Sequence, residues 1–336
     1  MPQERIAQVP KKDRGAARLM VVDRSAGGFF EAGFGDLPRM LRRGDCLVLN
    51  DSRVSPCRLR GRIGGREVEV LIVHHKEISP DETEVDAMVY PGQQFKTGSR
   101  IFITPREAEC TGEVISISEI GRILRLRSSV TPFGDLLHRF GSVPLPPYIT
   151  NPAIPPDRYQ TCFADPEGSA AAPTAGLHFT PEMFRRLAEA DIRSAFLTLH
   201  VGPGTFRPIT PKDIELGRLH SEPYALGGEA AEQIRQTRAA QGRVVAVGTT
   251  ACRTLEHVHS KFGDIRSDHG ATDLFIRAGH PFRAVDALLT NFHFPKTSLL
   301  MLVCAFAGRE IVMEAYRDAI RRKFDFYSFG DAMLIL

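Results

Sequence analysis

Four of the eleven histidines in this 336-residue chain lie close to Gly, Pro or Glu, in the stretches AAPTAGLHF, TLHVGPGTF, LHSE and LLTNFHFP. They are His178, His200, His220 and His293. An imidazole has an unperturbed pKa of ~6.5, so it can accept or donate a proton near neutral pH. These residues therefore predict general acid–base chemistry, and a hydrogen-bonded structural histidine is the alternative at each position.

The stretch AAPTAG before His178 suits neither a helix nor a strand, because Pro and Gly destabilise both. We predict a tight loop whose small residues let a ligand approach the backbone closely. His178 then follows as the reactive group at the end of the loop. A tight turn around a buried, hydrogen-bonded histidine is the alternative.

Polar residues also follow the predicted strands in LVLNDSRV, TLHVGPGTF, VAVGTT and LLTNFHFP. In an open α/β sheet, ligands bind beyond the carboxyl ends of the strands. We therefore expect these residues and the four histidines to line one site. The polar members of the set are Asn50, Asp51, Arg53, Glu222, Thr249, Thr250 and Asn291.

Other kinds of site receive less support from the same motifs. His and Glu are good ligands for Zn or Fe, but none of these motifs has the HxH, HExxH or HxxxH spacing. GPGTFR lacks the third Gly of a dinucleotide fingerprint, and GTTACRT lacks the Lys of a P-loop. Two further pairs, His257 with His259 and His74 with His75, are expected on the surface. Such loops suit an uncharged, flat group such as a nucleoside.

Composition limits the class of protein. No run reaches the roughly 18 apolar residues that cross a bilayer, and the start lacks the apolar core of a signal peptide. The six cysteines form no CxxC pair, which predicts buried thiols in a reducing cytoplasm. The net charge is +3, but residues 1–62 hold 13 Lys and Arg against 7 Asp and Glu. That excess predicts either a surface that faces phosphate or an ordinary solvated face.

The hydrophobic pattern changes along the chain. Short apolar runs at 18–23 and 45–51 predict buried strands. From about residue 57, six short runs alternate between apolar and polar residues and predict a small antiparallel barrel or sandwich, followed by a helix at 131–141. After residue 180, helical and strand patterns alternate, which is typical of a mainly parallel sheet.

The predicted fold class is therefore α/β, a mainly parallel sheet flanked by helices with an inserted small antiparallel β-barrel domain. Residues 1–56 and 145–336 form the α/β domain that carries the catalytic loops. Residues 57–144 form the inserted domain.

As an ordered set, these motifs resemble one enzyme family. LVLNDSRV, PLPPYI, YQTCF, AAPTAGLHF, TLHVGPGTFRP, HSE, VVAVGTT, LLTNFHFP and FYSFGDAML are similar to those of the S-adenosylmethionine:tRNA ribosyltransferase-isomerases of queuosine biosynthesis. The likeness extends from about residue 5 to the end. The family normally has a further short N-terminal segment with a first strand before Ile6, so the expectation here is either a missing edge strand or a misassigned start.

The resemblance implies a cytoplasmic transferase, expected to be monomeric and without a membrane. Such an enzyme uses S-adenosylmethionine as a ribose donor. It transfers and isomerises the ribosyl group onto 7-aminomethyl-7-deazaguanine at the tRNA wobble position, giving epoxyqueuosine and releasing adenine and methionine. S-adenosylmethionine is a substrate, and neither a metal nor another cofactor is expected. A metal-dependent hydrolase and a noncatalytic RNA-binding module remain the alternatives.

The expected roles divide into proton transfer and substrate binding. The catalytic set is His178, His200, His220 and His293, with Glu222 orienting His220 or holding a ribose hydroxyl. The substrate-binding set is Asn50, Asp51, Arg53, Tyr148, Thr174, Ala175, Gly176, Gly202, Gly204, Thr205, Thr249, Thr250 and Asn291.

Overall fold

The structure is a computed structural model that describes residues 2–103, 109–151, 153–202, 204 and 209–336. The chain divides into two compact units, one of Met1–Arg53 with Pro146–Leu336 and one of Val54–Leu145. The short strand β4 (Arg53–Val54) spans the boundary in sequence. Every residue of the predicted site falls within the range of the first unit.

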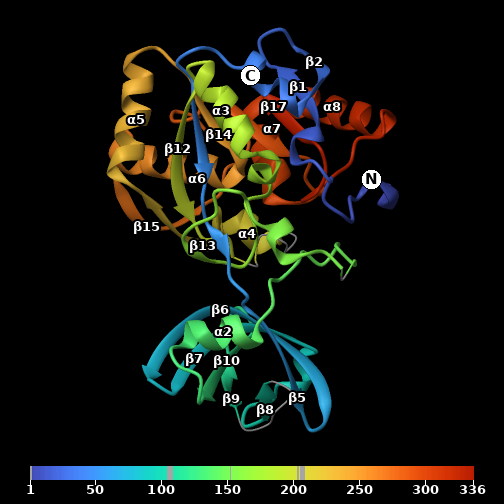
Figure 1. Cartoon of the computed structure of the whole chain (residues 1–336), viewed down its shortest axis with the longest axis vertical. Coiled ribbons are helices and arrows are strands. Elements are labelled where there is room, and N and C mark those ends of the chain that lie inside the picture. The colour runs from blue at the N-terminus through green and yellow to red at the C-terminus, as the bar shows by residue number, and fades with distance from the viewer. Residues whose placement is uncertain (1, 104–108, 152, 203, 205–208) are drawn as a thin grey trace. The chain divides into compact units, whose positions relative to one another are not determined.

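The first unit is built on a nine-stranded sheet in the order β15-β13-β12-β3-β14-β16-β17-β1-β2 (Figure 1). The strands are β1 (Arg18–Asp23), β2 (Gly28–Gly33), β3 (Cys46–Asn50), β12 (Arg193–Leu199), β13 (Arg218–Leu226), β14 (Val244–Val247), β15 (Asp268–Leu274), β16 (Ala287–Asn291) and β17 (Ala332–Ile335). The neighbours β12, β3, β14 and β16 run parallel, as do β17 and β1. The other pairs, β15 with β13, β13 with β12, β16 with β17 and β1 with β2, are antiparallel.

The expectation of a mainly parallel sheet is therefore wrong, because the sheet is mixed. The difference comes from β2, β13 and β17, which the sequence analysis does not predict as strands. The sequence of β13, RLHSEPYAL, contains charged residues and a proline, so it shows no continuous apolar run. Its place beside β12 gives it one buried face, which only the assembled sheet reveals.

Helices cover both faces of this sheet. One core joins Val48 and Leu197 of the sheet to α5 (Gly228–Ala239), α6 (Gly248–Phe262), α7 (Ser298–Ala307) and α8 (Arg309–Arg321). The opposite core joins Leu47 and Leu49 to α1 (Leu37–Met40) and α3 (Pro181–Glu189). Successive residues of β3 thus point to opposite faces and are buried on both. Among the described residues, no helix is long and apolar enough to cross a membrane.

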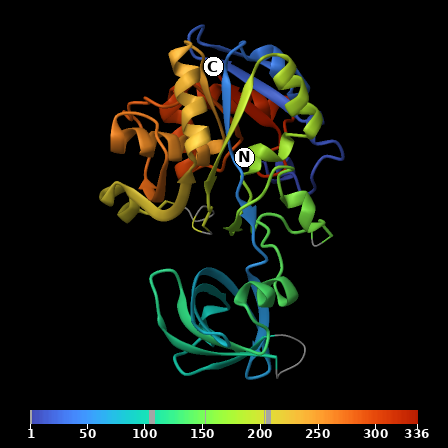
Figure 2. The same cartoon turned by 60° about the vertical axis from the view of Figure 1, so that its left-hand side comes forward.

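The second unit is a closed barrel in the order β10-β7-β6-β5-β8-β9, shown in blue to green in Figure 2. Its strands are β5 (Arg58–Ile63), β6 (Arg66–Ser79), β7 (Glu82–Tyr90), β8 (Arg100–Ile103), β9 (Cys110–Ile117) and β10 (Arg122–Ser128), followed by α2 (Phe133–Phe140). The pairs are antiparallel, with alternate residues such as Leu59 and Val70 buried inside. The predicted antiparallel barrel is confirmed.

Candidate active site

The parallel strands in the middle of the sheet end at one edge. β3 ends at Asn50, β12 ends just before His200, β14 ends just before Gly248, and β16 ends at Asn291. Because the carboxyl ends of parallel strands meet at the same edge, residues far apart in the sequence become neighbours. α6 begins at Gly248, directly after β14, so Thr249 and Thr250 lie in the first turn of a helix.

His178 ends a short 3-10 turn, Thr174–His178, that packs beside β16 and the start of α6. The ring is buried, at 6% exposure, and its centroid lies 5.0 Å from that of Phe34. Asn291 Nδ2 lies 3.3 Å from His178 Nε2, and the same nitrogen donates to the carbonyl of Tyr327. Burial, with the nearby charges of Lys11 and Arg14, lowers the pKa of His178 to about 4, so the ring is neutral at pH 7.

The small residues before His178 serve the protein's own packing. A Cβ at Gly176 would lie 2.9 Å from Phe163 Cζ and 2.9 Å from Thr161 Cγ2. Side chains of the same unit therefore occupy the space on that side of the glycine. Ala175 is buried against the start of α6, where it faces Gly248. Thr174 donates to Asn291 Oδ1 at 3.3 Å and so links the turn to β16.

A second group of residues forms around Glu222, in β13. Glu222 Oε1 lies 3.1 Å from His220 Nε2 and accepts from the backbone N–H of Gly202 at 2.9 Å. Its other oxygen is paired with Arg253 of α6. Burial acts to raise the pKa of Glu222, but Arg253, His220 and the Gly202 amide outweigh it and hold that pKa at about 2. Glu222 is thus a buried carboxylate, and His220 lies beside it.

Gly202 and Gly204 make this arrangement possible. A Cβ at Gly204 would lie 2.7 Å from His220 Nδ1, and one at Gly202 would lie 3.4 Å from His220 Cδ2. The two glycines of GPGTF therefore allow the loop to pack against the imidazole edge. Thr205, the remaining predicted residue of this loop, lies outside the described residues.

His200 and His293 lie at the same edge in different surroundings. His200 packs against Gly168, where an added Cβ would lie 2.8 Å from His200 Nδ1. Burial lowers the pKa of His200. Among the described residues, this buried Nδ1 has no hydrogen-bond partner. His293 Nε2 lies 2.8 Å from Thr290 Oγ1, and burial lowers the pKa of His293 to about 4. Its backbone N–H donates to Tyr316, so the ring is anchored between β16 and α8.

The polar residues at the ends of β3 mostly hold the protein together. Asn50 exchanges two hydrogen bonds of 2.9 Å with the backbone of Leu199, which ties β3 to β12. Asp51 accepts from Thr198 Oγ1 at 2.7 Å, and burial raises the pKa of Asp51. The exposed Arg53 donates to the carbonyl of Ala164.

The other predicted binding residues lie at two places on this edge. Tyr148 places its hydroxyl 2.6 Å from Ser328 Oγ and packs against Phe294 and Tyr327. Thr249 is buried in the first turn of α6, and Thr250 Oγ1 is a buried hydroxyl without a partner among the described residues.

The first turns of α6 connect the two groups of residues. Thr249 and Thr250 lie beside the turn that carries His178, and Arg253 reaches Glu222 from the next turn. Arg253 is a functional candidate that no sequence motif indicates, because it lies inside a helical pattern beyond the polar residues that follow the strand. An arginine that is buried, here at 5% exposure, is rare unless it is paired. Within the described ranges, no three metal-ligating side chains gather into a group that could hold an ion.

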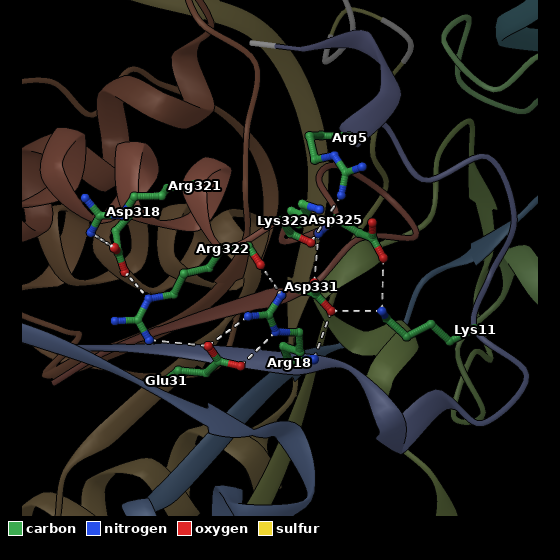
Figure 3. A network of polar contacts seen from close by, with 10 residues as sticks. All are labelled: Arg5, Lys11, Arg18, Glu31, Asp318, Arg321, Arg322, Lys323, Asp325 and Asp331. Atoms are coloured by element: carbon green, nitrogen blue, oxygen red, sulfur yellow. Dashed lines mark hydrogen bonds and ion pairs between the residues drawn. The ribbon is translucent and has the colours of Figure 1, made fainter.

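The basic residues near the N-terminus are largely paired with acids or backbone carbonyls (Figure 3). Arg18 and Arg322 both contact Glu31, and Arg321 and Arg322 contact the buried Asp318. Lys11 lies 3.1 Å from both Asp325 and Asp331. Arg14, by contrast, donates to three backbone carbonyls, of Asp157, Gln160 and Leu177. Lys11, Arg14 and Arg158 line one small pocket together with His178.

Comparison with known proteins supports one assignment for the whole chain. Residues 1–335 match the family model described as "Queuosine biosynthesis protein". The S-adenosylmethionine:tRNA ribosyltransferase-isomerases of Thermoanaerobacter sp. (strain X514) and Symbiobacterium thermophilum are 44% and 47% identical, over all of this chain and 97% of theirs. A crystal structure of S-adenosylmethionine tRNA ribosyltransferase from Thermotoga maritima is 35% identical and covers all of this chain and 98% of its own, with a TM-score of 0.57. This chain therefore belongs to the queuosine biosynthesis protein family.

Proposed function

We propose that this chain is an S-adenosylmethionine:tRNA ribosyltransferase-isomerase. It transfers the ribosyl group of S-adenosylmethionine to 7-aminomethyl-7-deazaguanine at the wobble position of tRNA and isomerises that group, with release of adenine and methionine. Relatives that carry this name match the chain over its whole length. The structural observation that best supports the proposal is the edge of the sheet, which carries the neutral imidazoles of His178 and His293 and, in a second group, His220 beside the buried carboxylate of Glu222.

The proposed reaction needs proton transfers at carbon and nitrogen. The sulfonium of S-adenosylmethionine acidifies the protons on the neighbouring C5′ of the ribose, so a well-placed base of moderate strength can remove one. A donor at a ring nitrogen then assists the departure of adenine. The aminomethyl nitrogen of the tRNA base attacks the anomeric carbon, and closure of the epoxide expels neutral methionine. His178, His200, His220 and His293 are the candidate groups for these proton transfers.

The other predicted residues bind the substrates in this proposal. Asp51, Arg53 and Asn291 anchor polar groups of the substrates, and the residues of the 3-10 turn and of the first turn of α6 contact the nucleoside. The reaction consumes S-adenosylmethionine and requires neither metal nor redox cofactor. We infer that the enzyme is a monomer and works in the cytoplasm on tRNA that carries the deazaguanine base.

The decisive experiment incubates the purified protein with S-adenosylmethionine and tRNA carrying 7-aminomethyl-7-deazaguanine. Mass spectrometry of the digested tRNA is expected to show epoxyqueuosine, and adenine and methionine are expected in equal amounts. tRNA with an unmodified guanine at the wobble position is the control. Binding of tRNA without any consumption of S-adenosylmethionine would instead identify a noncatalytic RNA-binding protein.

A further inference from the structure

β13 is irregular at the position of His220. Arg218 pairs with Leu274, but Glu222 pairs with Thr272, so three residues of β13 face the single residue Asp273 of β15. Extra residues in one strand bend it and re-aim its side chains, and such bulges are frequent next to active sites. The irregularity here turns the imidazole of His220 toward the loop that contains Gly202 and Gly204.

The contacts of Glu222 determine which nitrogen of His220 carries the proton. Glu222 is 1% exposed, and both its oxygens are engaged, one by His220 and Gly202 and the other by Arg253. A carboxylate can only accept hydrogen bonds. His220 Nε2 must therefore be the protonated nitrogen, which leaves a lone pair on Nδ1 in the neutral ring.

Nδ1 of His220 is the nitrogen that remains for chemistry. It lies over Gly204, and no described residue forms a hydrogen bond with it. The side chain is 32% exposed, so part of the ring is open to solvent. Nε2 of His178 and Nε2 of His293, by comparison, contact the uncharged side chains of Asn291 and Thr290, and Nδ1 of His200 is buried. Among the described contacts of these four histidines, the pairing with a carboxylate belongs to His220.

Arg253 holds the carboxylate in place from the other side. Its Nε donates to the carbonyl of Leu274 at 3.1 Å, which fixes the guanidinium between β15 and Glu222. The charged groups beside the irregularity are thus Arg218 and Glu222 on β13, Arg253 on α6 and Asp273 on β15, and the segment after β12 contributes the uncharged Gly202.

From this arrangement we infer that His220 is the base that takes the C5′ proton of S-adenosylmethionine at Nδ1, and that Arg253 is a positioning residue that acts through Glu222. The inference deepens the proposed function and rests on it. In this step the C5′–H bond breaks and the proton moves to Nδ1. The electron pair stays on C5′ beside the sulfonium. The imidazolium that forms is stabilised by Glu222, and Arg253 keeps that carboxylate oriented.

The first test follows the C5′ hydrogen directly. S-adenosylmethionine labelled with tritium at C5′ is incubated with the enzyme and modified tRNA, and both the tritium released into water and the adenine released are measured. We expect His220→Gln to lower both by at least about 10²-fold, the typical contribution of a positioned base. His259→Gln, which changes a histidine at the far end of α6, is the matched control and is expected to keep the wild-type rates.

The second test measures how turnover depends on pH in variants of the two partners. Glu222→Gln removes the charge that stabilises protonated His220, so the acidic limb of the profile is expected to move to lower pH. Arg253→Met frees Glu222 to stabilise that protonated ring more strongly, so the limb is expected to move to higher pH. Each shift should be on the order of one pH unit. Arg253→Lys keeps the positive charge and is expected to stay near the wild-type profile with lower turnover.

A purely structural role of Glu222 and Arg253 would not move the acidic limbs of the two variants in opposite directions. Melting temperatures identify any variant that fails to fold, and if Arg253→Met is lost, Arg253→Gln, which also removes the positive charge, takes its place. Limbs that stay in place in both Glu222→Gln and the uncharged Arg253 variant would overturn the role of Arg253, and tritium release that survives in His220→Gln would overturn the role of His220. If the wild-type enzyme releases neither adenine nor tritium, the proposed function itself fails, and this inference fails with it.

Discussion

Asn291 Nδ2 lies 3.3 Å from His178 Nε2, although 113 residues separate the two in sequence. Asn291 also donates to Tyr327 and accepts from Thr174, so its amide joins three segments of the chain. The lone pair on Nε2 of His178 is thereby engaged within the protein, and the ring is anchored at the end of β16. This relationship explains why a histidine that follows a flexible-looking stretch is rigidly buried.

His178 is expected to make the stability of the fold depend on pH. Its pKa is about 4 in the folded state and ~6.5 in the unfolded chain, so the unfolded chain takes up a proton that the folded state excludes. The free energy of unfolding therefore has its full value above about pH 6.5, and it falls by on the order of 3 kcal/mol as the pH decreases toward 4. The free energy of unfolding, measured by denaturant titration between pH 4 and 8, should depend less on pH in His178→Gln than in the wild type.

The turnover of His178→Gln separates the two roles considered for His178, proton transfer and structural support. A fall in turnover of 10² to 10⁴-fold with the fold intact would identify a proton-transfer group. A lower melting temperature with activity reduced only in proportion would remove His178 from the catalytic set. His259→Gln is the control for both measurements.

Gly176→Ala is expected to destabilise the first unit. The added methyl would lie 2.9 Å from Phe163 and from Thr161, and overpacking of this kind typically costs about 1–3 kcal/mol. The free energy of unfolding from urea titration measures the effect. Gly28→Ala, where a Cβ would meet nothing within 4 Å, is the control. Combining Gly176→Ala with Phe163→Leu should restore part of the loss, and no recovery would contradict the steric explanation.

Activity is expected to survive removal of metal ions. None of the histidine motifs has the spacing of a metal site, and the proposed steps need only proton transfer and nucleophilic attack. Turnover after exhaustive dialysis against a chelator should equal that of the untreated enzyme. A loss that zinc or iron restores would favour a metal-dependent enzyme instead.

The basic residues at two places on the first unit are expected to contribute to tRNA affinity. Reversing the charges of Arg42 and Arg43, or of Arg321 and Arg322, should weaken binding and flatten its dependence on salt, because fewer counterions are released. Arg322 is paired with Glu31 and Asp318, so melting temperatures are needed to separate lost affinity from lost stability. If both double variants bind tRNA as tightly as the wild type across a salt titration, these charges only face solvent.

The barrel of the second unit is expected to fold by itself. Its six strands close on one another, and it has its own buried residues, including Leu59, Val70 and Ile101. A fragment of residues 54–145 should give a β-rich circular dichroism spectrum and a single cooperative unfolding transition. A fragment that remains unfolded in buffer would show that this unit depends on the rest of the chain.

The elements with strong local patterns, and the family, can be predicted from the amino-acid sequence alone. The buried strand at 46–50, the barrel strands and the helices α3, α5, α6, α7 and α8 follow from hydrophobic periodicity, because burial on one or two faces imposes a repeat on the residues, whereas the short helix at Pro211–Leu216 is not predicted. The histidines and glycines of the site were also identifiable, since their positions after predicted strands and beside breakers are local features. The ordered motifs then identified the family that the comparisons show.

The direction of several strands and the partners of the polar side chains depend on how distant segments pack in the folded protein. β13 carries His220 and Glu222 but has no apolar run, and its place at β12 depends on pairing between distant backbone segments. Likewise, Gly176 gives room to Phe163, and Arg253 pairs with Glu222 across 31 residues of sequence. Such contacts join segments that have no local pattern in common, so their geometry exists only once the chain has folded.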